Sequence, residues 1–265
     1  MKNKTSIALL AFLIAPTIAE GSEIKLSGHR AVYELSFDSA KTNSGVIGAE
    51  GRYVFDLEDA CEGFALNERL VVKIARTEDN VLTDYRLSAF ESSAGSQYRF
   101  NTPTDFNGAT GQQAEGNLSI DLESETTEVD YEKAEDLSFK HPLLAPVAHV
   151  RAVIKAASEG EERHAAMIFD GDVNSPTYYA ATRISEVADD KTIEGTEDLS
   201  ELSRWKIDSV YFPPETGGED EGATPDFAFS AIIFENGVVA DLRLDYSEFA
   251  LKATLSELEM RESGC

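Results

Sequence analysis

The two cysteines are the residues of this chain best placed to do covalent chemistry. Cys61 stands in the stretch CEGFALNER, and Cys265 is the last residue. If the chain is exported to an oxidising compartment, the two most simply form one disulfide. Two free thiols and a bridge between two molecules remain alternatives. A redox-active pair is disfavoured, because no C-x-x-C spacing is present to lower the pKa of a thiol.

The histidines offer no metal-binding pattern. They are His29, His141, His149 and His164, and no two have the i, i+4 spacing that places both imidazoles on one helix face. His149 lies between valines of a predicted helix, so it is a candidate to line an interior. The structural alternative is a partly buried histidine bonded to a backbone carbonyl.

The acidic stretch DGDVN at 170–174 imitates the start of a calcium-binding loop. Ser175 and Pro176 replace the turn glycine and its neighbour, and Ala181 stands where the bidentate glutamate belongs. The sequence therefore predicts no calcium site here. The chain also lacks G-x-S-x-G, H-E-x-x-H and glycine-rich phosphate motifs, so we expect no cofactor and name no catalytic residue.

The charge is strongly acidic, with 49 Asp and Glu against 23 Lys and Arg and a formal net charge of −26. Such a surface repels nucleic-acid phosphates and anionic lipid headgroups, so the sequence predicts no nucleic-acid binding. It is typical of a soluble protein and could attract basic partners. The many carboxylates leave open a glycosidase-like acid pair, and hence a hydrolase, without singling one out.

Several aromatic residues are candidates to line an apolar cavity. Trp205, the only tryptophan, shares the stretch RWKIDSVYF with Phe212, and Phe229 and Phe249 follow in later apolar runs. Ordinary core packing is the structural alternative for all four.

The N-terminus has the features of a signal peptide. Two lysines precede the apolar run SIALLAFLIA, and Thr17 and Ala19 are the small residues that a signal peptidase reads. The run is too short to span a bilayer comfortably, so an uncleaved anchor is disfavoured. We predict a signal peptide over 1–19, a single domain over 20–265, a periplasmic location and no integral membrane segment.

Apolar and polar residues alternate with a period of two in most of the remaining chain. The pattern is clear at 29–37, 51–57, 64–74, 81–92 and 117–122, with Gly, Asn and Asp clusters between. It predicts a large antiparallel sheet rather than βαβ units.

One helix and one hairpin complete the predicted elements. The stretch PVAHVRAVIKAASEG predicts a helix from Pro146 that ends at Gly160 and packs an apolar stripe on the sheet. Asn236–Gly237 predicts a type I′ turn, within three consecutive strands over 227–258. The segment 213–226, rich in Pro, Gly and acidic residues, predicts a loop.

Several stretches together resemble the EipB-like family of periplasmic cell-envelope integrity proteins of alphaproteobacteria. They are YELSF, GRYVFDLEDACEGFALNERLVVKI and the run from TPDFAFSAIIFENGVVADLRLDYSEFALKATLSELE to the terminal cysteine. The likeness spans about residues 30–265. One departure is Lys206, which follows Trp205 where the family has a proline, and the acidic loop 213–226 has no counterpart in the family.

The resemblance implies a mainly β fold, in which a spiral, incompletely closed antiparallel sheet wraps about one main helix. It carries the family's disulfide over to Cys61 and Cys265 and implies no catalytic residue. It also implies a role in envelope integrity and stress resistance through protein contacts, with a periplasmic tetratricopeptide-repeat protein as a candidate partner. The alternative hypothesis is a carrier or sensor of a lipid or lipoprotein acyl chain, held in an apolar cavity of the sheet.

Overall fold

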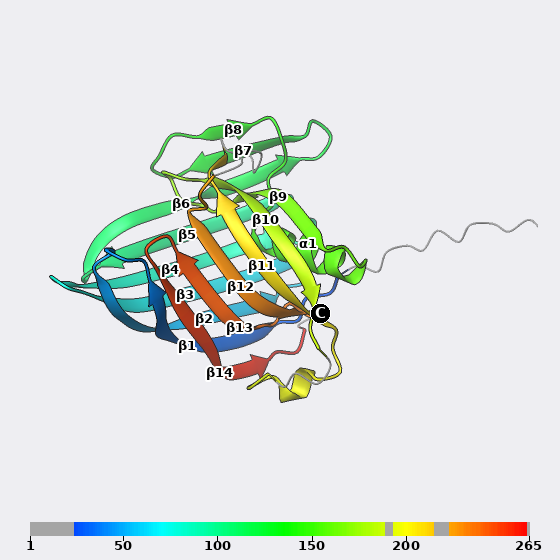
Figure 1. Cartoon of the computed structure of the whole chain (residues 1–265). Helices are drawn as coiled ribbons and strands as arrows, with labels where there is room; N and C mark the ends of the chain where they lie inside the picture. Colours follow the sequence, from blue (N-terminus) through cyan, green and yellow to red (C-terminus); the bar gives the residue numbers. More distant parts are fainter. Residues whose placement is uncertain (1–23, 189–192, 215–222, 264–265) are drawn as a thin grey trace, which may run out of the picture.

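The computed structural model describes residues 24–188, 193–214 and 223–263 (Figure 1). The predicted signal peptide and Cys265 lie outside these residues, and so does most of the acidic loop 213–226. The described residues form fourteen strands, one α-helix, α1 (Pro146–Ser158), and one 3₁₀ turn, η1 (Glu197–Leu199). The strands are β1 (His29–Ala40), β2 (Val46–Asp59), β3 (Gly63–Arg76), β4 (Asn80–Ser92), β5 (Gln97–Phe106), β6 (Ala109–Asp121), β7 (Thr126–Tyr131), β8 (Leu137–Phe139), β9 (Arg163–Phe169), β10 (Thr177–Glu186), β11 (Arg204–Phe212), β12 (Phe227–Phe234), β13 (Val239–Tyr246) and β14 (Phe249–Met260).

All these strands belong to one antiparallel sheet with the order β8-β7-β6-β5-β4-β3-β2-β1-β14-β13-β12-β11-β10-β9. Each half of the sheet is a meander that follows the chain. The halves meet where β1 pairs with β14, from His29 opposite Met260 to Ala40 opposite Phe249. The first and last strands therefore lie side by side in the middle of the sheet.

The predicted alternation is visible along β1. Ala31, Tyr33 and Leu35 are buried on the inner face of the sheet, whereas Glu34 and Ser36 are exposed. Successive residues of a strand point to opposite faces, so apolar residues at every second position give the sheet one face that can be covered. The inner faces of the other strands continue the same core.

The sheet curls because its two edges are consecutive in the chain. β8 forms one edge and β9 the other, and only residues 140–162 join them through α1. A flat sheet of this many strands would be on the order of 60 Å wide. The connection, with its 13-residue helix, reaches about 55 Å even when its other residues are fully extended. In Figure 1, β9 to β13 accordingly cross in front of β1 to β5.

The two edges approach one another without pairing directly. Leu144, just before α1, forms a parallel bridge with Ile168 on the free side of β9. The Phe169 ring, at the end of β9, packs on Tyr98 and Phe100 of β5 with ring centroids 6.2 and 5.2 Å apart. Side-chain packing and one helix thus cover the seam without pairing the two edges, which confirms the predicted incompletely closed antiparallel sheet about one main helix.

The helix α1 begins at Pro146 as predicted. Its apolar stripe, which includes Val147, Ile154 and Ala157, is buried, and the helix contacts β9 and β10. At its end Gly160 adopts a positive φ of 80° and donates its N–H to the Ala157 carbonyl, while Glu161 donates to Ala156. This pair of bonds is a Schellman motif, which satisfies two of the last helical carbonyls.

The hairpin between β12 and β13 corrects one prediction. Gly237 has a positive φ of 90°, but Asn236 is not among the residues with positive φ, so the turn is not type I′. The Gly237 N–H donates to the Phe234 carbonyl and the Phe234 N–H to the Val238 carbonyl. These bonds enclose a three-residue loop with a left-handed glycine. The Asn236 carbonyl is used elsewhere, because it accepts a hydrogen bond from the Ser27 N–H.

Candidate functional site

A group of carboxyl and tyrosine side chains on the inner face of the sheet is the candidate site. We name it the carboxyl–tyrosine cluster. Its members come from six different elements or connections of the described chain: Tyr53, Glu68, Tyr85, Tyr98, Asp170 and Tyr211. The curl of the sheet is what brings β2 to β5 opposite β9 to β11.

Strand register fixes one side of this cluster. Leu70 of β3 pairs with Tyr53 of β2 on one side and with Tyr85 of β4 on the other, so all three share the inner face. Glu68 lies two residues before Leu70 and therefore on the same face. The Tyr53 hydroxyl donates a hydrogen bond to Glu68 Oε2 at 2.9 Å, which is a diagonal contact between neighbouring strands.

Glu68 occupies an unusual environment for a carboxyl group. Burial raises its pKa to about 7, the hydrogen bond from Tyr53 opposes this, and the nearby charge of Asp170 raises it further. The side chain still keeps part of its surface accessible to solvent. Glu68 is therefore a half-buried carboxyl group among the inward side chains of β2 to β4.

Asp170 approaches from the opposite side, in the connection between β9 and β10. Burial also raises its pKa, to about 6, with a contribution from the charge of Asp172. Its surface is exposed at the rim of the sheet, yet enough protein surrounds it to remove much of its hydration. The Asp170 N–H donates to the Pro176 carbonyl at 2.8 Å and closes the base of the loop.

The DGDVN motif forms this loop and uses its second carboxylate internally. Asp172 Oδ1 accepts hydrogen bonds from the Asn174 N–H at 2.6 Å and from Gln112 Nε2 at 2.7 Å. Within the described ranges, no group of three or more His, Cys, Asp or Glu side chains is placed to hold a metal ion. The Asp172 carboxylate is thus engaged within the loop that carries Asp170.

The tyrosine hydroxyls complete the cluster. Burial raises the pKa of Tyr85, and so do the charges of Glu68 and Asp170. The same causes raise the pKa of Tyr98, with Tyr85 and Glu91 contributing as well. These mutual effects indicate that the hydroxyl and carboxyl groups face a shared region.

Beside the cluster, rings from four strands form a continuous aromatic wall, consisting of Tyr211, Phe227, Phe229, Tyr246 and Phe249. Tyr211 stacks on Phe229 at 5.9 Å, Phe227 contacts Tyr246 at 5.2 Å, and Tyr246 stacks on Phe249 at 5.2 Å between ring centroids. Tyr211 belongs to both groups, because its ring joins the wall and the charge of Asp170 helps burial to raise its pKa.

The structure brings only some of the predicted cavity residues together. Phe229 and Phe249 both lie in the aromatic wall. Trp205 packs against the core, six residues before Tyr211 on β11. Phe212 follows Tyr211 directly and so points to the opposite face of the sheet.

His149 lies apart from the cluster, between α1 and β9. Its side chain is only 8% exposed, and its ring faces His164 with centroids 6.0 Å apart. Burial lowers the pKa of His149 to about 4, with a smaller contribution from His164. Its Nδ1 atom is buried without a hydrogen-bond partner among the described residues.

The neighbourhood of Cys61 bears on the predicted disulfide, although Cys265 lies outside the described residues. Arg261 forms an ion pair with Asp56 at 2.7 Å, and the Ser263 hydroxyl donates to Asp59 Oδ2 at 2.8 Å. The C-terminal segment therefore runs beside the end of β2, close to Cys61. The pairing of Cys61 with Cys265 stays a prediction.

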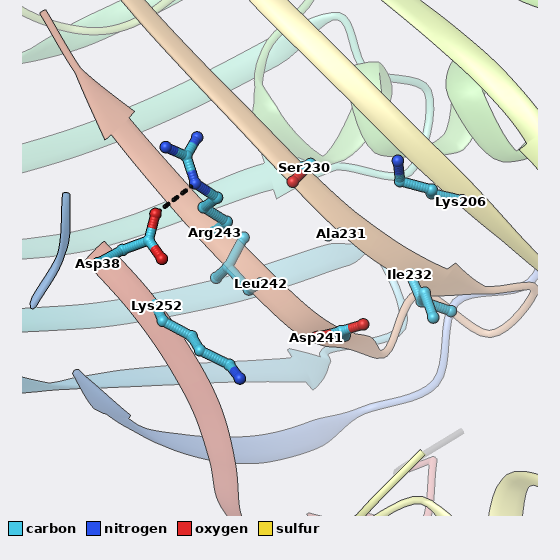
Figure 2. A pocket seen from close by; sticks show the side chains of 9 residues that line it. All are labelled: Asp38, Lys206, Ser230, Ala231, Ile232, Asp241, Leu242, Arg243 and Lys252. Carbon is cyan, nitrogen blue, oxygen red and sulfur yellow. Dashed lines mark hydrogen bonds and ion pairs between the residues drawn. The ribbon is translucent and has the colours of Figure 1, made fainter. Parts of the chain in front are cut away.

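A surface pocket of about 290 Å³ lies elsewhere, on the outer face of β11 to β14. Figure 2 shows Arg243 and Asp38 pointing toward one another across it, with Lys206 and Lys252 nearby. Arg243 pairs with Asp38 at 2.9 Å and with Asp245 at 2.7 Å. Because Arg243 is already neutralised by these two ion pairs, we consider this pocket a weaker candidate for a binding site than the inner face.

Sequence reasoning missed Glu68, although a signal was present. In FALNERLVVKI, Glu68 stands at an inward position between Leu66 and Leu70, where the pattern calls for an apolar residue. Asp170 gave no such signal, because only the curl of the sheet brings it to the cluster. In the part of the chain that the structure describes, no helix is long and apolar enough to cross a membrane.

The fold and the site together define a barrel-like β protein with an open seam and a polar cluster on its inner face. The chain belongs to the EipB-like family, whose model matches residues 20–262.

A curated protein and a solved structure, both from Brucella abortus, are similar to it. The cell envelope integrity protein EipB of strain 2308 is 25% identical over 256 residues, which cover 94% of this chain and 90% of that protein. The crystal structure of a beta-barrel-like protein, of domain of unknown function DUF1849, superposes with a TM-score of 0.79 at 24% identity. The match covers 91% of this chain and 100% of that one, and it supports the fold.

Proposed function

We propose that this chain is a non-catalytic periplasmic protein that maintains the integrity of the cell envelope through contacts with other proteins. The observation that carries the proposal is membership of the EipB-like family over residues 20–262, with a relative named for cell envelope integrity. The predicted signal peptide supports the periplasmic location. A tetratricopeptide-repeat protein of the same compartment is the candidate partner.

The end of the sheet where β4 begins and β5 ends suggests where such contacts form. Leu82 and Phe106 are large apolar side chains with exposed fractions of 41% and 44%. Their backbones lie close together, because the Asn107 N–H donates to the Leu82 carbonyl and the Leu82 N–H to Asn107 Oδ1. Phe106 pairs with Thr83, so Leu82 and Phe106 point to opposite faces at this end of the sheet. Exposed apolar residues at one end of a sheet favour protein contacts there.

The test combines deletion with crosslinking in the native bacterium. Deletion should sensitise cells to detergent and other envelope stress, and the wild-type gene should restore resistance. A Leu82→Ser/Phe106→Ser double variant should weaken crosslinking to the partner. Leu122→Ser is the matched control, since Leu122 is 70% exposed at a different turn. Normal stress resistance of the deletion strain, with no specific crosslinked partner, would refute the proposal.

The second candidate function is a carrier or sensor of a lipid or lipoprotein acyl chain. The aromatic wall favours it, because five adjoining rings on a partly accessible inner face could pack against an alkyl chain. Native mass spectrometry of protein purified gently from the periplasm tests this candidate. A bound species of lipid mass would support the carrier role, and a bare protein would favour the contact role alone.

A further inference from the structure

Two histidines, one on α1 and one on β9, each keep a buried ring nitrogen without a hydrogen-bond partner. Among the described residues, no group bonds to His149 Nδ1 or to His164 Nε2. His29 shows the contrast, because it is 1% exposed and its Nδ1–H donates to the Ser27 carbonyl at 2.8 Å. Buried polar atoms of folded proteins are nearly always bonded, so the two unpartnered nitrogens indicate a missing partner.

The packing of α1 on β9 brings these two imidazoles together inside the curled sheet. His149 is 8% exposed, and its ring centroid lies 6.0 Å from that of His164. His164 pairs with Thr182 of β10, which pairs with Ser209 of β11. Ser209 lies two residues before Tyr211, so this row of side chains faces inward. The Thr182 and Ser209 hydroxyls are hydrogen-bonded at 2.8 Å, and the histidines therefore have polar neighbours on the sheet.

The separation of the two rings fits one metal ion between them. With metal–nitrogen bonds of about 2.0–2.1 Å, two imidazoles on one ion have ring centroids about 5.2 Å apart at a tetrahedral angle and about 6.4 Å apart when opposed. The observed 6.0 Å lies within this range. Imidazole ligands favour Zn²⁺, Cu²⁺ and Ni²⁺, whereas Mg²⁺ and Ca²⁺ prefer oxygen ligands. A bridging water molecule is the alternative partner of similar size.

Both imidazoles are in the neutral form that metal ions require. Burial lowers the pKa of His149 to about 4, with a contribution from His164. Burial also lowers the pKa of His164, although the charge of Glu161 opposes this. At neutral pH a metal ion therefore has no charged ring to deprotonate. His164 is partly accessible to solvent, which provides a route for the ion.

We propose that His149 and His164 together bind one Zn²⁺ or similar transition-metal ion, which fastens α1 to the edge strand β9. No third His, Cys, Asp or Glu of the described residues joins them, so water or a hydroxyl group completes the coordination. The two ligands come from different elements, and for this reason no spacing within one helix indicates the pair. Because residues 140–162 join the two edges of the sheet through α1, the bound ion would strengthen the seam. The inference is independent of the protein-contact role and of the acyl-carrier candidate.

Isothermal titration calorimetry of the untagged mature chain, freed of metal with a chelator, tests the proposal with Zn²⁺ at neutral pH. Excess Mg²⁺ stays in the buffer, because it occupies the carboxylates of this acidic protein but competes poorly for imidazole. One Zn²⁺ per chain should bind saturably and raise the melting temperature. No saturable binding by the folded protein would mean that water alone bridges the rings, and would overturn the proposal.

Three variants separate the site from general attraction of cations to an acidic protein. His149→Gln and His164→Gln each remove one of the two ligands and should weaken Zn²⁺ binding at least about tenfold, which corresponds to about 1.4 kcal/mol. His141→Gln is the matched control and should leave the affinity unchanged. His141 Nε2 is also buried without a partner, but its ring packs on Phe139, with centroids 5.8 Å apart, and not on a second imidazole. Equal losses in all three variants, or none in the two ligand variants, would refute the site.

Electron paramagnetic resonance of bound Cu²⁺ keeps the test decisive if His149→Gln folds poorly. The unmodified chain should show coupling of the copper electron spin to two imidazole nitrogens, and His164→Gln should show coupling to one. A merely structural role of the histidines would not produce this change. A spectrum of the unmodified chain without two coupled nitrogens would contradict the proposal.

Discussion

Glu68 and Glu91 are two inward carboxyl groups on neighbouring strands, and burial raises the pKa of each to about 7. Their surroundings differ completely. Both oxygens of Glu91, which is 2% exposed, accept hydrogen bonds from α1, at 2.8 Å from the Val147 N–H and 2.7 Å from the Ala148 N–H. Glu68 receives one hydrogen bond from Tyr53 and stays partly accessible.

The difference separates a structural carboxyl group from a candidate binding group. Ala145, the residue before α1, provides no side-chain cap, so Glu91 satisfies the free N–H groups at that helix end from another element. Its desolvation is compensated within the protein, whereas that of Glu68 is not. A raised pKa alone therefore identifies neither role, and the number of hydrogen-bond donors distinguishes them.

The largest expected effect concerns the predicted disulfide. It tests whether the surroundings of Glu68 and of Glu91 depend on the same overall fold. Cys61→Ser should lower the free energy of unfolding by about 2–5 kcal/mol if Cys61 pairs with Cys265. Because the bridge would join the last strand to the β2–β3 connection, amide exchange at the helix end and around Glu68 should accelerate together. Unchanged denaturant unfolding under oxidising conditions would show that the bridge is absent or without structural effect.

Glu91→Gln should distinguish the two carboxyl groups most directly. The glutamine oxygen can accept a hydrogen bond from one of the two helix N–H groups. Its amide NH₂ group is a donor and leaves the other helix N–H without an acceptor. A buried donor left without an acceptor costs about 1–3 kcal/mol, so we expect a loss of about 2 kcal/mol in denaturant unfolding. Glu68→Gln is the matched control and should not lose stability. Equal losses in the two variants would mean that both groups are structural.

His149 predicts an acid dependence at the helix, opposite in sign to that of the carboxyl groups. Burial, then the neighbouring His164, lowers its pKa from 6.5 to about 4, so the unfolded chain binds a proton that the folded protein does not. Stability should fall as the pH drops below 6.5, by about 1.4 kcal/mol per pH unit at most. His149→Leu should flatten this slope in melting curves recorded across that range. An unchanged slope would assign it to other groups, His164 first.

The smallest expected effect is that of Glu68→Gln on stability. Its folded pKa lies above its ordinary value, so its stabilising contribution is present at low pH and is lost as the pH rises through about 7. Removing the charge should leave stability near neutral pH unchanged or raise it by up to about 1 kcal/mol, since partial hydration reduces the penalty. A clear loss in denaturant unfolding would instead give Glu68 a structural role like that of Glu91.

Local patterns predicted the elements that obey a single period. β1, β3, β4, α1 and the last three strands follow directly from alternation or from the helix signals. β5 was missed, because Pro103 interrupts its pattern. The structure accommodates this proline where the register between β5 and β6 shifts, next to Asp105. Proline is tolerated at such irregular positions, because no ladder hydrogen bond is needed there.

Features that depend on distant segments were beyond local patterns. The position of the Asn236–Gly237 turn was predicted correctly, but its type was not, because the hairpin closes as a three-residue loop in which Gly237 has a positive φ and Asn236 does not. The Asn236 carbonyl also accepts a hydrogen bond from the distant Ser27 N–H. The cluster shows the same limitation. Glu68 could be identified as a charged residue at an apolar position, whereas Asp170 joins it only through the curl of the sheet.

The pairing of β1 with β14 also has consequences for how the molecule folds. The residues that it joins are separated by more than 200 positions in the chain, as in His29 and Met260. Contacts between residues so far apart in the chain form slowly, because the entropy of closing a long loop is lost before the contact contributes any stabilisation. Each meander can assemble from local hairpins, but the two can join only after the last strand has been released. A newly made chain must therefore stay soluble until then, although its two central strands still lack their partners. The high negative charge of the chain should help to keep it soluble during that time.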